Sequence, residues 1–366
     1  MFLADLRPVI NQFQWAGDAI ACVQYGTGHI HRTYRLSCRE GDRLQDYILQ
    51  KINHRVFTAP EQLIDNMLAV TAHLRQKSCA RGDDPLRRVV TLIPTWQGEY
   101  LYRTPQGDYW RAQVFIEGAS ASLQAQSPWQ IYQAAHAFGA FQDALGDFPP
   151  SRLHVTIPHF HHTPRRFEDF LGALRRNTCA RAQSARAEIA FALQRAGEVG
   201  RLAALVAAGE MPERVTHNDS KLDNVLLDDE TGRAICVIDL DTVMPGLAVF
   251  DFGDLVRSCC NPAREDEPDL KLVSFHLPTF ALLARGFLDA TRAFLTLPEI
   301  EHLAFGARLI AFEQGLRFLT DYLVGDVYYP ANRPAHNLAR ARTQFKLVRE
   351  MEAAFADMQA LIKKYR

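Results

Sequence analysis

The sequence predicts an α+β protein with a small β-rich N-terminal lobe over residues 1–117 and a larger helical lobe over residues 118–366. Apolar and polar residues alternate through residues 20–50, as they do in half-buried strands. In the second part of the chain, apolar residues recur at helical spacing. A chain of 366 residues with 48% hydrophobic content is also long enough to bury two cores.

The N-terminal lobe is predicted to hold an antiparallel sheet. Residues 20–50 favour two or three strands, with Gly26 and Gly28 in the first turn. Two further apolar runs, residues 87–96 and 107–118, are separated by a segment rich in turn residues and predict another hairpin. The sheet then leads into helical sequence.

Five segments predict amphipathic or buried helices. The last of them spaces Val348, Met351, Phe355, Met358 and Ile362 by 3, 4, 3 and 4 residues and predicts one long helix packed on the helical lobe. A coiled-coil dimer is the alternative for it, but the heptad run is short and a monomer is favoured. The five segments are 60–76, 129–145, 275–294, 301–324 and 348–362.

Four histidines fall within nine positions after the helix predicted over 129–145. They are His154, His159, His161 and His162. Zinc binding is one interpretation, but no cysteine and no helical His-Glu-x-x-His frame accompanies them. Prolines on both sides indicate an irregular loop. We prefer a loop that lines the cleft of a substrate.

The stretch from Thr216 to Asp254 concentrates nine carboxylates against two bases. A soluble fold rarely gathers acid in this way without a cation to offset it. Phosphoryl transfer in kinases uses an Asp that receives the proton of the substrate hydroxyl, an Asn five residues later on a metal, and a further Asp on Mg²⁺. Asp219, Asn224 and Asp239 fit these three roles in spacing.

The phrases HNDSKLDNVLLD and VIDLDTVMPGLAVFDFGD resemble the aminoglycoside phosphotransferase and choline kinase group, and within it the N-acetylhexosamine 1-kinase branch. The segments FHHTPRRF and GLRFLTDYL are similar to that branch as well. The resemblance implies a bilobal protein-kinase-like fold that uses ATP and Mg²⁺ and accepts a small-molecule sugar. It also implies that His217 opens the catalytic motif, so we include it with Asp219 among the catalytic residues.

The resemblance assigns the nucleotide side to the N-terminal lobe. Gly26 and Gly28 are expected to lie over the phosphates, since glycine lets backbone amides approach closely. Lys51 lies on the strand that would carry the nucleotide-facing lysine, although strand alternation leaves open whether it points to phosphate or to solvent. The backbone at Phe115 and Glu117 is expected to hold the adenine, with a plain sheet-to-helix connection as the alternative.

Three groups of residues complete the expected site. Asn224 and Asp239 would hold Mg²⁺, and Asp241 would bind the ion directly or support its ligands if the strand continues past Asp239. Asp251 is expected to anchor the catalytic loop by accepting hydrogen bonds. Arg317, Asp321 and Tyr328 would line the sugar pocket by the resemblance, whereas an exposed ion pair is the alternative for Arg317 and Asp321.

Composition excludes some classes of protein. The formal net charge of −1 offers no electrostatic surface for nucleic acid or for an anionic membrane. No segment predicts a membrane span or a signal peptide, so we expect a cytoplasmic protein. The seven scattered cysteines are expected to be reduced thiols.

The predicted reaction is transfer of the γ-phosphate of ATP to the anomeric hydroxyl of N-acetylglucosamine or N-acetylgalactosamine. Other acceptors, such as an aminoglycoside, choline, homoserine or a different sugar, are alternatives. A nucleotide-binding scaffold without catalysis is a rival of another class. The retention of Asp219, Asn224 and Asp239 together favours an enzyme.

Overall fold

The computed structural model describes residues 3–26, 30–122 and 127–366. The chain forms two compact units. The sheet unit consists of Met1–Ser120, Asp147–Pro158 and Leu226–Pro245. The helical unit consists of Ala121–Gly146, His159–Val225 and Gly246–Arg366. The division thus differs from the single boundary expected after residue 117, because two later segments of the chain return to the sheet unit.

An antiparallel sheet forms the core of the sheet unit, with strand order β1-β2-β3-β6-β4 and with β5 paired to β6. Leu36 faces Tyr47 across β2 and β3, and Leu49 faces Ala112 across β3 and β6. These side chains pack with α1 in a core that also contains Phe13. The elements are α1 (Leu3–Ile10), β1 (Asp18–Gln24), β2 (Arg32–Glu40), β3 (Arg43–Ile52), β4 (Leu92–Ile93), β5 (Tyr102–Arg103) and β6 (Tyr109–Val114).

Two helices and a second small sheet complete the sheet unit. The helix predicted over 60–76 is confirmed as α2, which begins at a proline and buries Leu63, Met67 and Val70. The hairpin of β9 and β10 pairs with β7 and leads to a short 3₁₀ turn, η5. The elements are α2 (Pro60–Ala80), α3 (Pro85–Arg88), β7 (Ala119–Ser120), β9 (Val225–Asp228), β10 (Ala234–Val237) and η5 (Leu240–Thr242).

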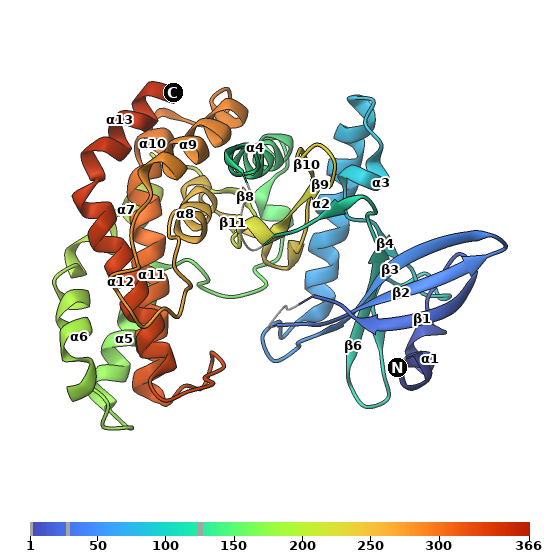
Figure 1. Ribbon diagram of the computed structural model, residues 1–366, viewed down its shortest axis with the longest axis horizontal. Helices are drawn as coiled ribbons and strands as arrows, with labels where there is room; N and C mark the ends of the chain where they lie inside the picture. Colours follow the sequence, from blue (N-terminus) through green and yellow to red (C-terminus); the bar gives the residue numbers. More distant parts are fainter. Residues whose placement is uncertain (1–2, 27–29, 123–126) are drawn as a thin grey trace. The chain divides into compact units, whose positions relative to one another are not determined.

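The helical unit is built around long helices that pack closely. In Figure 1, α11 and α12 lie side by side, and α11 also packs on α5 and α8. The elements are α4 (Pro128–Ala144), α5 (Thr163–Arg176), α6 (Arg186–Leu193), α7 (Arg201–Ala207), β8 (Arg214–Thr216), α8 (Ala248–Cys259), α9 (Leu277–Thr291), α10 (Leu297–Glu301), α11 (Leu303–Val324), α12 (His336–Ala353) and α13 (Phe355–Tyr365), with η4 (Leu222–Asn224) before β9 and β11 (Met244–Gly246) after η5.

Helices α4 and α9 approach each other through glycines. A methyl group at Gly286 would lie 2.4 Å from the carbonyl oxygen of Tyr132, and one at Gly139 would lie 2.9 Å from the carbonyl oxygen of Phe287. Real side chains do not tolerate such distances, so only glycine permits this crossing. Close contact fixes the position of α4, which carries the Gln142 side chain that donates to Asp251 of α8.

The C-terminal segment differs from the expectation of one long helix. Ala354 ends α12 with φ −94° and ψ 8°, and α13 begins at the next residue. Val348 and Met351 are buried on α12, whereas Met358 and Ile362 are buried on α13. Helix α12 packs on α11, but α13 packs mainly on α9. The break therefore redirects one apolar stripe onto two different partners.

All seven cysteines are free thiols, as predicted. Burial raises the pKa of the Cys236 thiol to about 12. Cys79 and Cys179, in contrast, are exposed. Among the described residues, no helix is both long and apolar enough to cross a bilayer.

Candidate active site

The loop between β8 and β9 folds back on itself around Asp219. The side-chain amide of Asn224 donates to the main-chain oxygen of Asp219 at 2.8 Å and to its carboxylate at 3.1 Å. The amide of Asp219 donates to Nδ1 of His217 at 3.3 Å. Asn218 takes a left-handed conformation, with φ 64°, which turns the chain sharply before Asp219. Asp219 and Asn224 are therefore held together, as their spacing predicts.

Asp251, on α8, anchors this loop through its carboxylate. Its carboxylate is fully buried and accepts the amide of Asn218 at 2.7 Å and that of His217 at 2.9 Å. The side chain of Gln142, on α4, donates to the same carboxylate at 2.6 Å. The predicted anchoring role of Asp251 is confirmed. One carboxylate thus joins α4, α8 and the catalytic loop.

Replacing Asp251 with alanine is expected to lower the stability of the protein by about 3 kcal/mol, because buried donors left without an acceptor are expensive. For a chain of 366 residues, with about 2.1 cal/mol/K of unfolding entropy per residue, that corresponds to a fall in melting temperature of roughly 4 °C. A thermal melt measures the change, with Asp357→Ala on the exposed face of α13 as the control. Equal melting temperatures for the two variants would contradict the anchoring role.

The ring of His217 packs against α4. It is fully buried and makes edge contacts with Phe138 and Phe141, at centroid distances of 5.3 and 5.9 Å. We had expected His217 among the catalytic residues, but a ring enclosed by α4 does not face a substrate. Its hydrogen bond to the Asp219 amide makes it a positioning residue instead.

A positive charge that the sequence did not predict lies next to Asp219. Nζ of Lys221 lies 3.1 Å from the carboxylate of Asp219. Burial alone would lower the pKa of Lys221, but the carboxylates of Asp219, Asp223 and Asp254 outweigh burial and raise it. Lys221 is therefore a cation throughout the physiological range. A lysine two residues after the expected base was the available sequence signal.

Asp239 begins the turn η5 in the sheet unit. It is exposed and adopts a left-handed conformation, with φ 61° and ψ 56°. A non-glycine residue in this region is strained, and such strain gathers at functional sites. Burial alone would lower the pKa of Arg111, but the charges of Asp241 and Asp239 raise it, so Asp239 lies within electrostatic reach of this guanidinium.

Asp241 is buried and paired, which differs from the metal-ligand role expected of it. One carboxylate oxygen accepts from Nη1 of Arg111, and the other accepts from Nη2 of Arg111 at 2.8 Å and lies 2.5 Å from Nε2 of His31. Burial alone would raise the pKa of Asp241, but Arg111 and His31 lower it far below the usual range. With both oxygens in use, Asp241 holds the turn rather than a metal ion.

Lys51, whose direction strand alternation left open, points to an acidic residue of the sheet unit. Its Nζ pairs with Asp108 at 2.6 Å, in a partly exposed ion pair. Arg111, which faces Gln50 across β3 and β6, instead projects from the opposite face of the sheet toward Asp241. The signal for Arg111 was an arginine within an apolar strand, where burial requires a charged partner.

The residues expected around the nucleotide lie in the sheet unit. Gly26 is exposed with φ 75°, a conformation that suits glycine, whereas Gly28 lies outside the described residues. Phe115 makes an edge contact with Tyr25 at 5.7 Å. The carbonyl of Glu117 accepts from Arg87 at 3.1 Å. The aromatic contact between Tyr25 and Phe115 therefore lies next to Gly26, just after the end of β1.

The residues expected around the acceptor lie on and after α11. Asp321 is buried, and its carboxylate accepts the amides of Val327, Tyr328 and Tyr329 at 2.8–2.9 Å. Asp321 therefore shapes the following loop rather than contacting a substrate, and it forms no ion pair with Arg317 among the described residues. Tyr328 is exposed at 55%. Arg317 is half-buried and donates to Gln314 at 3.1 Å.

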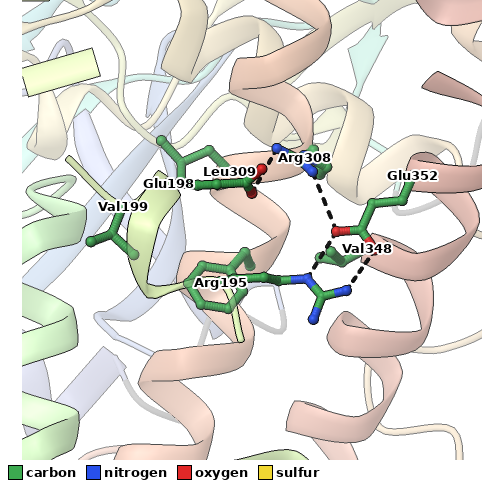
Figure 2. A pocket seen from close by; sticks show the side chains of 8 residues that line it. Arg195, Glu198, Val199, Arg308, Leu309, Val348 and Glu352 are labelled. Carbon is green, nitrogen blue, oxygen red and sulfur yellow. Dashed lines mark hydrogen bonds and ion pairs between the residues drawn. The ribbon is translucent and has the colours of Figure 1, made fainter. Parts of the chain in front are cut away.

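A small pocket elsewhere in the helical unit is not a candidate for the active site. Figure 2 shows Arg195 and Arg308 directed at Glu352, with Glu198 on the far side of Arg308. The cavity measures about 10 Å³, which is room for roughly one water molecule. Every charge drawn there has an opposite partner, so the cluster supports the packing of α11 and α12.

Comparison with known proteins gives a family and a fold. Residues 21–283 match the model of the family described as "Phosphotransferase enzyme family". Similar solved structures include a microcompartment-associated aminopropanol kinase, with 14% identity, a TM-score of 0.60 and coverage of 98% of both chains. A spectinomycin phosphotransferase solved with ADP and spectinomycin has 14% identity and a TM-score of 0.60, over 97% of this chain and 98% of that chain.

A choline kinase from Cryptosporidium parvum Iowa II is also similar, with 14% identity and a TM-score of 0.51, over 93% of this chain and 91% of that chain. At such low identities the likeness concerns the fold. It confirms the predicted protein-kinase-like α+β fold, with a β-sheet N-terminal region and a helical C-terminal part.

Proposed function

Because the chain belongs to the phosphotransferase enzyme family, we propose that it transfers the γ-phosphate of ATP to the anomeric hydroxyl of an N-acetylhexosamine. The observation that carries the kinase chemistry is the pairing of Asn224 with Asp219 inside one short loop. The phrases that resemble the N-acetylhexosamine kinases support the choice of acceptor. N-acetylglucosamine and N-acetylgalactosamine are both candidates, since one epimer differs from the other by a single hydroxyl direction.

Asp219 receives the proton of the acceptor hydroxyl and orients that hydroxyl for attack. Its carboxylate is about a quarter exposed, so a substrate can reach it. Lys221 holds the same carboxylate at 3.1 Å and adds positive charge beside the transferred phosphoryl group. Most of the rate then comes from positioning and from neutralising negative charge.

The donor set fits Mg²⁺, a hard cation that takes oxygen ligands. Nδ2 of Asn224 is committed to Asp219, which leaves the amide oxygen as its ligand atom. Asp239 offers an exposed carboxylate at a strained turn. When bound, the ion would offset the negative charge of the ATP phosphates. For the nucleotide itself we propose Gly26, Phe115 and the backbone at Glu117.

A coupled assay of ADP release tests this function. The screen compares free N-acetylhexosamines, other sugars, amino alcohols and aminoglycosides at equal concentration. Turnover of an N-acetylhexosamine, with the sugar 1-phosphate as the product, supports the proposal. Turnover of only an amino alcohol or an aminoglycoside would replace the acceptor and keep the kinase chemistry.

Replacing Arg317 with alanine is expected to raise KM for the acceptor and to lower kcat/KM about ten- to a hundred-fold, because a charged hydrogen bond to a substrate oxygen is lost. KM for ATP should stay nearly constant. Steady-state kinetics with both substrates varied measures these effects. The matched control is Arg285→Ala, which removes an exposed arginine from α9. Unchanged acceptor kinetics in a folded Arg317 variant would remove Arg317 from the site.

A further inference from the structure

Two arginines of the helical unit converge on Phe160 without an acidic partner. Arg166, on α5, donates from Nε and Nη2 to the carbonyl oxygen of Phe160 at 3.3 and 3.1 Å. The guanidinium of Arg317, on α11, lies 5.2 Å from the ring of Phe160 and 5.6 Å from the ring of Tyr329. Among the described residues, neither arginine forms an ion pair, whereas most other half-buried arginines of this chain do.

The carboxylate of Glu313, which lies close to both arginines, is already in use. Glu313 lies one helical turn before Arg317, but one of its oxygens is 2.9 Å from Nδ1 of His161 and the other accepts from Thr163 at 2.6 Å. Nε2 of His161 lies 2.9 Å from the carbonyl of Asn218. Since both of its neighbours are acceptors, the ring donates from both nitrogens and is an imidazolium. Its charge offsets that of Glu313.

Among the described residues, the two guanidinium groups therefore lack ion-pair partners of their own. Burial lowers the pKa of Arg166, and the neighbouring charge of Arg317 lowers it further. Burial alone would lower the pKa of Arg317 as well, and the tyrosines Tyr329 and Tyr328 with Glu313 raise it. Two guanidinium groups in one half-buried place repel each other unless an anion lies between them.

The free donors of both arginines remain accessible. Arg317 uses Nη1 for Gln314, and Arg166 uses Nε and Nη2 for Phe160. Within the described part of the chain, none of the other guanidinium nitrogens of Arg166 and Arg317 is both buried and unpaired. These N–H groups are therefore not sealed from solvent, and the planar fork of a guanidinium suits a carboxylate or a phosphate.

The arginine pair also lies beside the catalytic loop. His161 contacts the residue before Asp219 on one side and Glu313 on the other. Arg317 follows Glu313 by one turn of α11, which is about 5.4 Å along the axis. The same hydrogen-bonded row thus connects the loop of the proposed base to the helix that carries Arg317.

We propose that Arg166 and Arg317 together bind an anionic substituent, a carboxylate or a phosphate, on the hydroxylated acceptor. The inference rests on the proposed function and refines it: the preferred acceptor is an acidic derivative of an N-acetylhexosamine rather than the neutral sugar. A cationic acceptor such as choline or an aminoglycoside would meet repulsion at this place.

The experiment compares N-acetylglucosamine with N-acetylmuramic acid and N-acetylglucosamine 6-phosphate, which add a carboxylate and a phosphate to the same sugar. We expect kcat/KM to be at least about ten-fold higher for one acidic sugar than for the neutral one. Arg166→Gln should abolish this preference and leave KM for ATP unchanged. The control is Arg165→Gln, which alters an exposed neighbour on the same helix and should retain the preference.

The possible results separate the inference from the proposed function. Equal or better use of the neutral sugar overturns the inference and keeps the hexosamine kinase. A rise in KM for ATP in Arg166→Gln, with an unchanged sugar preference, also overturns it, because the pair then serves the nucleotide. Turnover of cationic acceptors alone overturns both. If no acceptor reacts, a melting-temperature rise with an acidic sugar that Arg166→Gln removes supports the inference, and the lack of such a rise overturns it.

Discussion

Replacing Asp219 with asparagine is expected to lower kcat at least 100-fold while ATP and the acceptor still bind. General base catalysis supplies a factor of about 10² to 10⁴, and an amide cannot receive the proton. Asparagine has nearly the same shape, and the hydrogen bond from Asn224 to the main-chain oxygen at this position does not depend on the carboxylate. The loop should therefore keep its conformation.

Single-turnover kinetics together with binding of both substrates measures this loss. Glu230→Gln is the matched control, since Glu230 is an exposed acid on the β9–β10 hairpin that follows the same loop. Its kcat should equal that of the wild type. A folded Asp219→Asn variant that keeps more than about a tenth of the wild-type kcat would contradict the assignment of Asp219 as the base.

Replacing Asp239 with alanine is expected to weaken Mg²⁺-dependent ATP binding and to lower kcat at the same time. The Mg²⁺ ion that Asp239 would hold serves both the binding of ATP and the transfer of its phosphate. Titration of Mg²⁺ at fixed ATP measures the shift. We expect saturation to require at least about ten-fold more Mg²⁺, which is the loss of one charged interaction. The same Mg²⁺ dependence as in the wild type would exclude Asp239 as a ligand.

Asp241→Asn provides the comparison for that experiment. Asp241 is paired with Arg111 and His31, so its replacement leaves a buried guanidinium poorly compensated. We expect a lower melting temperature with an Mg²⁺ titration midpoint close to that of the wild type. The comparison of these two variants, at positions only two residues apart, thus distinguishes metal binding from support of the turn.

Local spacing was sufficient to predict much of the catalytic loop. Asp219 and Asn224 are five residues apart, and a loop of that length brings their side chains together with few alternatives. Asp251 was expected to accept hydrogen bonds from the loop, and the main-chain amides of His217 and Asn218 supply them. The helix over 60–76 had both a start signal and a clear apolar stripe.

Long-range partners were not predictable in the same way. Alternation showed that Ile48, Gln50 and Ile52 share a face, but it could not tell which face of the sheet would meet Asp241. For this reason the sequence could not predict that Arg111 pairs with Asp241. The partners of Asp321 lie in an irregular loop six to eight residues later, and no periodic pattern in the sequence predicts them.

The single carboxylate of Asp251 also makes catalytic competence a cooperative property of the fold. Its three donors come from α4 and from the loop after β8, segments separated by more than seventy residues. The loop cannot take its working shape until α4 has docked, and the glycine crossing with α9 fixes where α4 docks. Opening of the helix pair α4 and α9 would therefore remove the Gln142 donor from Asp251 and loosen the loop that carries Asp219 and Asn224.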